Sequence, residues 1–122
     1  MDPTTRTILI VAVAGILAKL FLGGKADKDA DVPALIAAGA LLVDVRTPGE
    51  FSGGHIKGAI NIPVGSITAG IEKKAKDKSK AIIVYCHSGA RSGAAKKSLI
   101  KAGYTNVVNA GSLHRMHKVL GQ

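Results

Sequence analysis

The chain has 122 residues, enough for one compact domain and too few for two. Its formal net charge is +9, which attracts anions in general, but most lysines fall in or beside predicted helices without interleaved aromatic residues. We therefore expect a solvated basic surface and no nucleic-acid partner. A single cysteine excludes an internal disulfide and a multi-cysteine metal site, and the histidines lack ligand spacing, so we expect no metal and no cofactor.

Residues 1–24 form a hydrophobic N-terminal segment. Within it, residues 8–22 are apolar except for Lys19, and they span roughly 22 Å as a helix, short of the ~30 Å hydrocarbon core. Flanking residues would lengthen this span, which favours an uncleaved anchor, whereas Gly24-Lys25-Ala26 resembles a signal cleavage site. Both alternatives predict a membrane-associated or exported protein (periplasmic if bacterial) that contacts the membrane through residues 8–22. Basic residues nearly balance across the run, so the side of the membrane stays open.

A linker and one folded domain follow this segment. Residues 25–31 are charged and lack apolar periodicity, which predicts a linker, and residues 32–122 form the domain. Its predicted elements alternate between helix and strand. In chain order they are a helix over 31–38 capped by Asp31, strands over 41–45 and 59–62, a helix over 66–75, a strand over 80–85, a helix over 92–101, a strand over 106–108 and a helix over 113–120. This order predicts an α/β fold: a three-layer sandwich whose mainly parallel central sheet carries helices on both faces.

The strand over 80–85 leads directly into Cys86, and a short glycine-containing turn separates it from the next helix. Ligands bind at the carboxyl ends of strands in open α/β sheets. Inward-pointing amides in this turn would form an anion nest, to which the helix N-terminus and Arg91 add positive charge. Such a nest lowers the pKa of the Cys86 thiol and ionises it, as a nucleophile requires. The predicted loop around the nucleophile comprises His87, Ser88, Gly89, Ala90, Arg91 and Ser92.

The alternative interpretation is that Cys86 is a buried residue at the end of a strand and has no catalytic role. His87 would act as a cation or hydrogen-bonding group, or face solvent.

Supporting roles are predicted for residues near the end of the first strand. Asp44 and Arg46 are two residues apart on a strand, so both point the same way, and we expect an ion pair that holds nearby loops. A catalytic role of the pair is the alternative. Glu50 is expected to help fix Arg46. His55 is expected to make a local bond that orders the glycine turn at 53–54.

Three ordered stretches make the chain resemble the rhodanese family of sulfurtransferases. Leu42-Val-Asp-Val-Arg-Thr-Pro-Gly-Glu-Phe resembles the DVR…E-F/Y motif of the family, and Gly54-His-Ile-Lys-Gly-Ala-Ile-Asn-Ile-Pro resembles its GHI-x-GA-x-N-I-P segment. The CHSGAR loop follows at the expected distance. The resemblance covers residues 32–111 and implies a rhodanese-like fold, with Cys86 as the nucleophile and residues 87–91 as its amide cradle.

The resemblance implies an enzyme of the thiosulfate sulfurtransferase type. Such an enzyme moves sulfane sulfur from thiosulfate or a similar anionic donor to cyanide, a thiol or a protein acceptor through a Cys86 persulfide. Three alternatives remain: a membrane-associated sulfur-relay or binding module fed by a protein partner, a phosphatase-like enzyme of the same fold, and an inactive scaffold. The loop from Cys86 to Arg91 is one residue shorter than in phosphatases of similar fold, which favours the sulfurtransferase.

Overall fold

The structure, a computed structural model, describes residues 25–122. The predicted membrane or signal segment over 8–22 lies outside these residues, so its role and the localisation that it implies remain predictions. Within residues 25–122, none of the helices is both long enough and apolar enough to span a bilayer.

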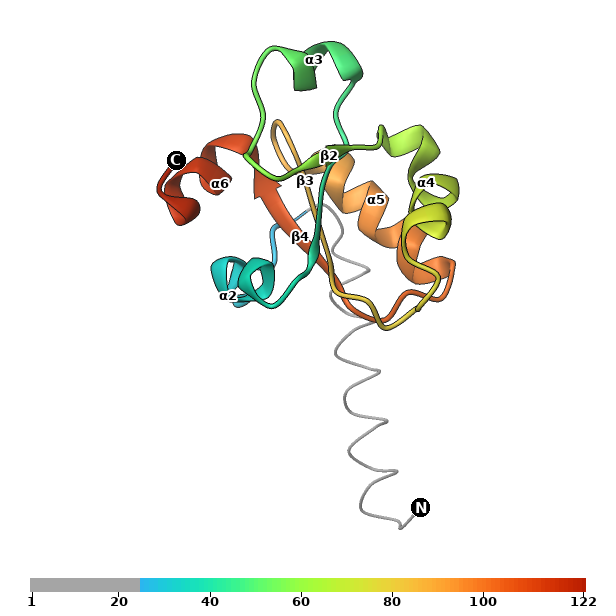
Figure 1. Cartoon of the computed structure of the whole chain (residues 1–122). Helices are drawn as coiled ribbons and strands as arrows, with labels where there is room; N and C mark the ends of the chain where they lie inside the picture. The colour runs from blue at the N-terminus through green and yellow to red at the C-terminus, as the bar shows by residue number, and fades with distance from the viewer. Residues whose placement is uncertain (1–24) are drawn as a thin grey trace.

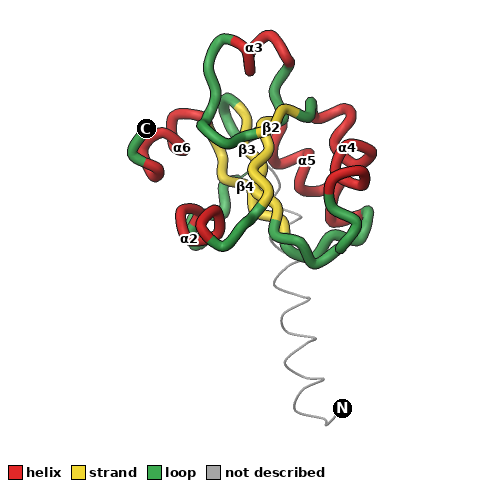
Figure 2. Tube along the Cα trace, in the orientation of Figure 1, coloured by secondary structure: helices red, strands yellow, loops and turns green. Residues whose placement is uncertain are grey.

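Four parallel strands form the central sheet, in the spatial order β2-β1-β3-β4. In chain order the strands are β1 (Leu41–Asp44), β2 (Ile60–Asn61), β3 (Ile82–Cys86) and β4 (Val107–Ser112). The α-helices are α2 (Val32–Ala37), α3 (Pro48–Ser52), α4 (Ile67–Lys74), α5 (Ala90–Lys101) and α6 (Leu113–Leu120), and a 3-10 turn, η1 (Val64–Ser66), precedes α4. Helices α4 and α5 cover one face of the sheet and α2 and α6 cover the other, as Figures 1 and 2 show. This arrangement confirms the predicted three-layer α/β sandwich.

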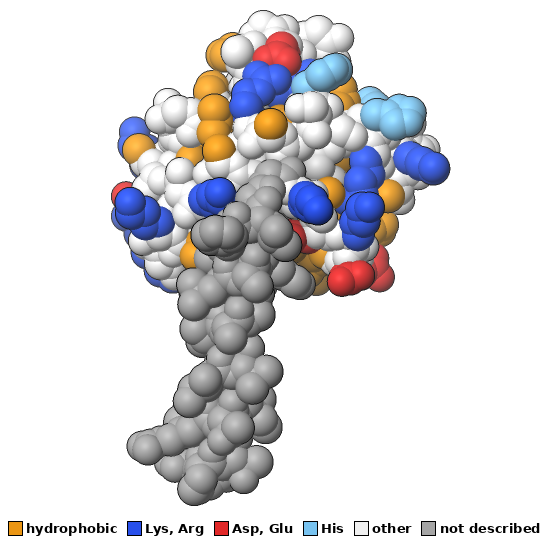
Figure 3. Space-filling model, turned by 180° about the vertical axis from the view of Figure 1, so that it is seen from behind, with side chains coloured by type: hydrophobic (Ala, Val, Ile, Leu, Met, Phe, Trp, Pro, Cys, Tyr) orange, Lys and Arg blue, Asp and Glu red, His pale blue; other side chains and the backbone are white. Residues whose placement is uncertain are grey.

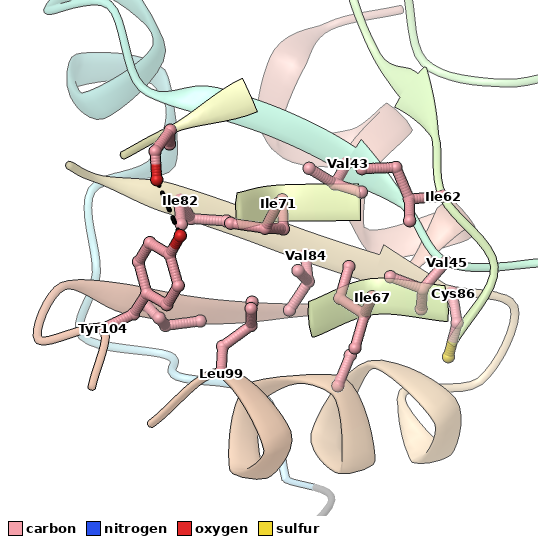
Figure 4. Close-up of a cluster of buried hydrophobic side chains, with 13 residues drawn as sticks. Val43, Val45, Ile62, Ile67, Ile71, Ile82, Val84, Cys86, Leu99 and Tyr104 are labelled. Atoms are coloured by element: carbon pink, nitrogen blue, oxygen red, sulfur yellow. Dashed lines mark hydrogen bonds between the residues drawn. The ribbon is translucent and has the colours of Figure 1, made fainter. Parts of the chain in front are cut away.

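Strand β3 divides the core into two clusters, because successive side chains of a strand point to opposite faces. Ile82, Val84 and Cys86 point toward α4 and α5, whereas Ile83 and Tyr85 point toward α2 and α6. Figure 4 shows the first cluster, with the Cys86 sulfur at its edge near the first turn of α5. Cys86 therefore ends a buried strand that is packed between the two helical layers.

Most elements lie within two residues of their predicted bounds, but two elements differ. Helix α3 is absent from the predicted elements, although Thr47 and Glu50 form a capping box at its N-terminus. Strand β4 extends four residues beyond the predicted strand over 106–108. Its register shifts opposite Val84 and Tyr85, which leaves Ala110 as the extra residue of a β-bulge next to the Cys86 loop.

The predicted linker over 25–31 has no helix or strand, yet part of it docks on the domain. Asp27 donates its N–H to the Asn109 carbonyl at 2.7 Å, and its carboxylate pairs with Lys96 at 2.6 Å. At least one charged residue of the predicted linker, Asp27, therefore makes polar contacts with β4 and α5.

Basic side chains are spread over the described part of the face shown in Figure 3, with other side chains between them. The prediction that the protein has no nucleic-acid partner stays a prediction.

Candidate active site

Cys86 is the last residue of β3 and is completely buried. The chain turns sharply after it, and helix α5 begins at Ala90. Gly89, the N-cap of α5, has φ of 100°, a left-handed conformation that a residue with a Cβ adopts only with strain. The glycine thus folds the predicted loop, residues 87–92, back over the sulfur, which its own N–H contacts.

The loop places hydrogen-bond donors around the Cys86 sulfur. The Gly89 N–H lies 2.9 Å from Sγ, and the Ser92 hydroxyl oxygen lies 3.5 Å away. Burial alone would raise the pKa of the Cys86 thiol. The Ser92 hydroxyl and the backbone N–H groups of Ser92, Gly89 and Ser88 outweigh burial and hold this pKa below its usual value. The predicted ionisation of the nucleophile therefore has a structural basis in this loop.

Arg91, in the first turn of α5, forms an ion pair with Glu50 of α3. Its Nη1 and Nη2 atoms lie 2.6 and 3.0 Å from the two carboxylate oxygens of Glu50. The hydrogen bond from Arg91 lowers the pKa of Glu50 to about 2. The pKa of Arg91 is raised mainly by Glu50, and the charge of the nearby Cys86 also contributes.

The predicted role of Glu50 as a support for Arg46 is therefore wrong, since Glu50 holds Arg91 instead. The physical reason is α3, which is absent from the predicted elements. This short helix carries Glu50 over the carboxyl edge of the sheet, toward the start of α5 (Figure 1).

Asp44 and Arg46 form the predicted ion pair, and both side chains are buried. Asp44 accepts hydrogen bonds from the backbone N–H, Nε and Nη2 of Arg46. Arg46 also donates from Nη2 to the Gly54 carbonyl at 2.7 Å. The pair therefore holds the segment after α3 against the end of β1, in agreement with the structural role that was expected of it.

The remaining predicted residues are His55 and the loop residues His87, Ser88 and Ala90, whose side chains make no hydrogen bond to the sulfur within residues 25–122. Nδ1 of His55 lies 2.8 Å from the Phe51 carbonyl, and the His55 ring stacks on Phe51, which confirms the predicted local bond. His87, Ser88 and Ala90 are exposed on the outer side of the loop. Among residues 25–122, no three histidine, cysteine or acidic side chains are grouped so that they could hold a metal ion.

Asn109 lies near the site, although the sequence predicts no role for it. Its Oδ1 lies 2.7 Å from the Ser92 hydroxyl, which in turn lies beside the Cys86 sulfur. Asn109 and Ser92 are both buried. A single asparagine just after the predicted strand over 106–108 gives no local signal of this contact, because the contact depends on how β4 packs against α5.

Comparison with known proteins agrees with this geometry. The model of the rhodanese-like domain family matches residues 28–113, which include all three motifs, the Cys86 loop among them. The chain belongs to the rhodanese-like domain family. The predicted family, fold and enzyme type are thereby confirmed.

Individual relatives show how far the similarity extends. The thiosulfate sulfurtransferase PspE of Escherichia coli is 43% identical over 81 residues, which cover 65% of this chain and 78% of PspE. A solved structure described as a rhodanese with anions from E. coli is 41% identical with a TM-score of 0.60, over 62% of this chain and 89% of that one. A human single-domain sulfurtransferase is 27% identical with a TM-score of 0.62, over 72% and 90%. The chain spans only 54%, 56% and 63% of three other relatives.

Proposed function

We propose that this protein transfers sulfane sulfur from thiosulfate or a similar anionic donor to a thiophilic acceptor, through a persulfide on Cys86. The Cys86 thiolate attacks the outer sulfur of thiosulfate, and a bond forms between Sγ and that sulfur. The bond between the two sulfurs of the donor breaks, and its electron pair leaves with sulfite. Cyanide or a thiolate then attacks the terminal sulfur of the persulfide and carries it away, which returns Cys86 as a thiolate.

The observation that carries this proposal is the set of donors around a buried thiol with a lowered pKa. The Gly89 N–H already lies 2.9 Å from Sγ, and the Ser88 and Ser92 N–H groups contribute to the same low pKa. These groups would hold the negative charge of the thiolate and then that of the persulfide. The positive end of α5 and the Arg91 guanidinium favour an anionic donor at the same place.

The proposal is tested by the intact mass of the purified protein after thiosulfate and then after cyanide. We expect a gain of one sulfur mass that cyanide removes, and no gain in the Cys86→Ala variant. No gain in folded wild-type protein would exclude thiosulfate as the donor. A gain only from a persulfidated protein would favour the relay module, and a gain in the Cys86→Ala variant would exclude Cys86 as the carrier.

Arg91→Met is expected to raise the KM for thiosulfate roughly tenfold or more, about the effect of losing one hydrogen bond to a charged group. The variant removes a cation and also leaves the Glu50 carboxylate without its partner, so that a negative charge faces the anionic donor. Steady-state formation of thiocyanate measures the change.

The matched control is the double variant Arg91→Met/Glu50→Gln, which lacks the unpaired carboxylate. Its KM should fall back part of the way toward that of the wild type. An unchanged KM in the Arg91→Met variant would show that Arg91 only braces α3 and does not bind the donor.

A further inference from the structure

A series of polar contacts, buried at Ser92 and Asn109, joins the nucleophile to the docked residues 25–27. It runs from the Cys86 sulfur to the Ser92 hydroxyl, then to the Asn109 side chain, and from there to residues 25–27. Ser92 and Asn109 are 0% and 1% exposed, so water does not compete for these groups. The polar groups of these two side chains must therefore find their hydrogen-bond partners within the protein.

The contacts of Asn109 fix which end of its amide faces Ser92. Its Nδ2 donates to the Lys25 carbonyl at 3.1 Å, and its Oδ1 accepts the Gly111 N–H at 3.0 Å. Oδ1 is consequently the atom that lies 2.7 Å from the Ser92 hydroxyl oxygen. An amide oxygen only accepts hydrogen bonds, so Ser92 must donate its proton to it.

Ser92 has one hydroxyl proton and three acceptors within reach. Asn109 Oδ1 is the nearest at 2.7 Å, the Gly89 carbonyl is at 3.1 Å, and the Cys86 sulfur is the most distant at 3.5 Å. The Ser92 hydroxyl shares its one proton among these acceptors, so its bond to Asn109 weakens the stabilisation that it gives to the Cys86 thiolate.

We propose that Asn109 is a positioning residue that competes with Cys86 for the Ser92 proton, and that docked residues 25–27 hold Asn109 in the competing orientation. This inference concerns the acidity of the thiol that the proposed function uses as its nucleophile, and it therefore rests on that function. Asn109 touches neither the donor nor the sulfur and acts only through Ser92.

Residues 25–27 form hydrogen bonds with both the backbone and the side chain of Asn109. Asp27 and Asn109 exchange two bonds, one from the Asp27 N–H to the Asn109 carbonyl and one from the Asn109 N–H to the Asp27 carboxylate at 2.8 Å. Lys96 of α5 holds the same carboxylate at 2.6 Å. When this segment leaves, only the Gly111 N–H still holds the Asn109 amide in place, so the bond from Ser92 to Asn109 weakens and more of the Ser92 proton turns toward Cys86. Undocking of residues 25–27 thus makes the thiol more acidic.

Several charged groups lie on the elements packed around the same thiol, and any effect of theirs must be separated from this one. They are Arg91 of α5 with its partner Glu50 of α3, the buried Asp44–Arg46 pair after β1, the Asp27–Lys96 pair, Arg115 of α6, which donates to the Ala110 carbonyl, and His87 next to Cys86. Only the Asn109 effect passes through the Ser92 hydroxyl, and this property gives the test its control.

The test measures the rate at which iodoacetamide alkylates Cys86 in the full chain as a function of pH, which reports the pKa of the thiol directly. In the Asn109→Ala variant this pKa is expected to fall by about one unit, the order of a hydrogen bond to a charged group. The same substitution in a Ser92→Ala background should shift the pKa by much less. A merely structural role of Asn109 would show no such dependence on Ser92.

Asp27→Ala is the second variant, because it keeps Asn109 and every group that touches Ser92. Its Cys86 pKa should also fall, and the fall should shrink when Ser92 is replaced by alanine. An unchanged or raised pKa in folded Asn109→Ala protein would overturn the proposal, as would a fall of the same size in the Ser92→Ala background. Alkylation needs no sulfur donor, so a failure of thiosulfate loading with these shifts intact would reject the proposed function alone.

Discussion

Cys86→Ser is expected to lower kcat/KM for sulfur transfer from thiosulfate to cyanide by at least about a thousand-fold, as for loss of a catalytic nucleophile elsewhere. Serine has nearly the same size and would occupy the same buried position, but its hydroxyl does not ionise in the range where a thiol does. The donors that lower the thiol pKa therefore have no anion to stabilise. Thiocyanate formation measures the loss.

The fold of the Cys86→Ser variant is the control for this result. Cys86 lies at the edge of the core cluster and the substitution leaves no cavity, so the midpoint of denaturant unfolding should stay close to that of the wild type. Turnover within tenfold of the wild type in a folded variant would contradict a mechanism that passes through the Cys86 sulfur.

Asp44→Asn is expected to lower the free energy of unfolding by about 3–5 kcal/mol, the usual cost of removing one partner from a buried ion pair. The Asp44 side chain is 0% exposed, and both of its carboxylate oxygens accept bonds from Arg46. The neutral amide turns an NH₂ group toward one of these donors and leaves the guanidinium charge buried without compensation. Guanidinium chloride unfolding measures the change.

The chain provides a matched exposed pair for comparison. Lys78 and Glu72 lie 3.9 Å apart with side chains 46% and 53% exposed. Exposed pairs contribute little, so Glu72→Gln should change the free energy of unfolding by no more than about 1 kcal/mol. Similar small effects of Asp44→Asn and Glu72→Gln would show that the Asp44–Arg46 pair does not stabilise the domain.

Local features of the sequence carry enough information for most elements of the fold. Asp31 accepts the N–H of Ala34 and caps α2 as predicted, and the apolar run before Cys86 forms the buried strand β3. Such features depend on neighbours in the chain, through capping bonds and the periodicity of apolar residues. Helix α3 carries a local signal too, the Thr47–Glu50 capping box, but its five residues are too few for periodicity to reveal.

The sequence by itself determined the order of strands and helices along the chain except α3, the candidate nucleophile Cys86 and the loop that follows it, because these follow from neighbouring residues and from motifs of one family. The tertiary structure alone decided which groups meet this loop: Glu50 pairs with Arg91, and Asn109 reaches Ser92 while residues 25–27 dock behind it. These partners are far apart in the chain, and their meeting depends on how α3 folds over the sheet edge and how β4 packs against α5. Local patterns such as periodicity and capping residues do not predict these contacts. Each of these polar side chains could equally lie on a solvated surface until the elements pack together.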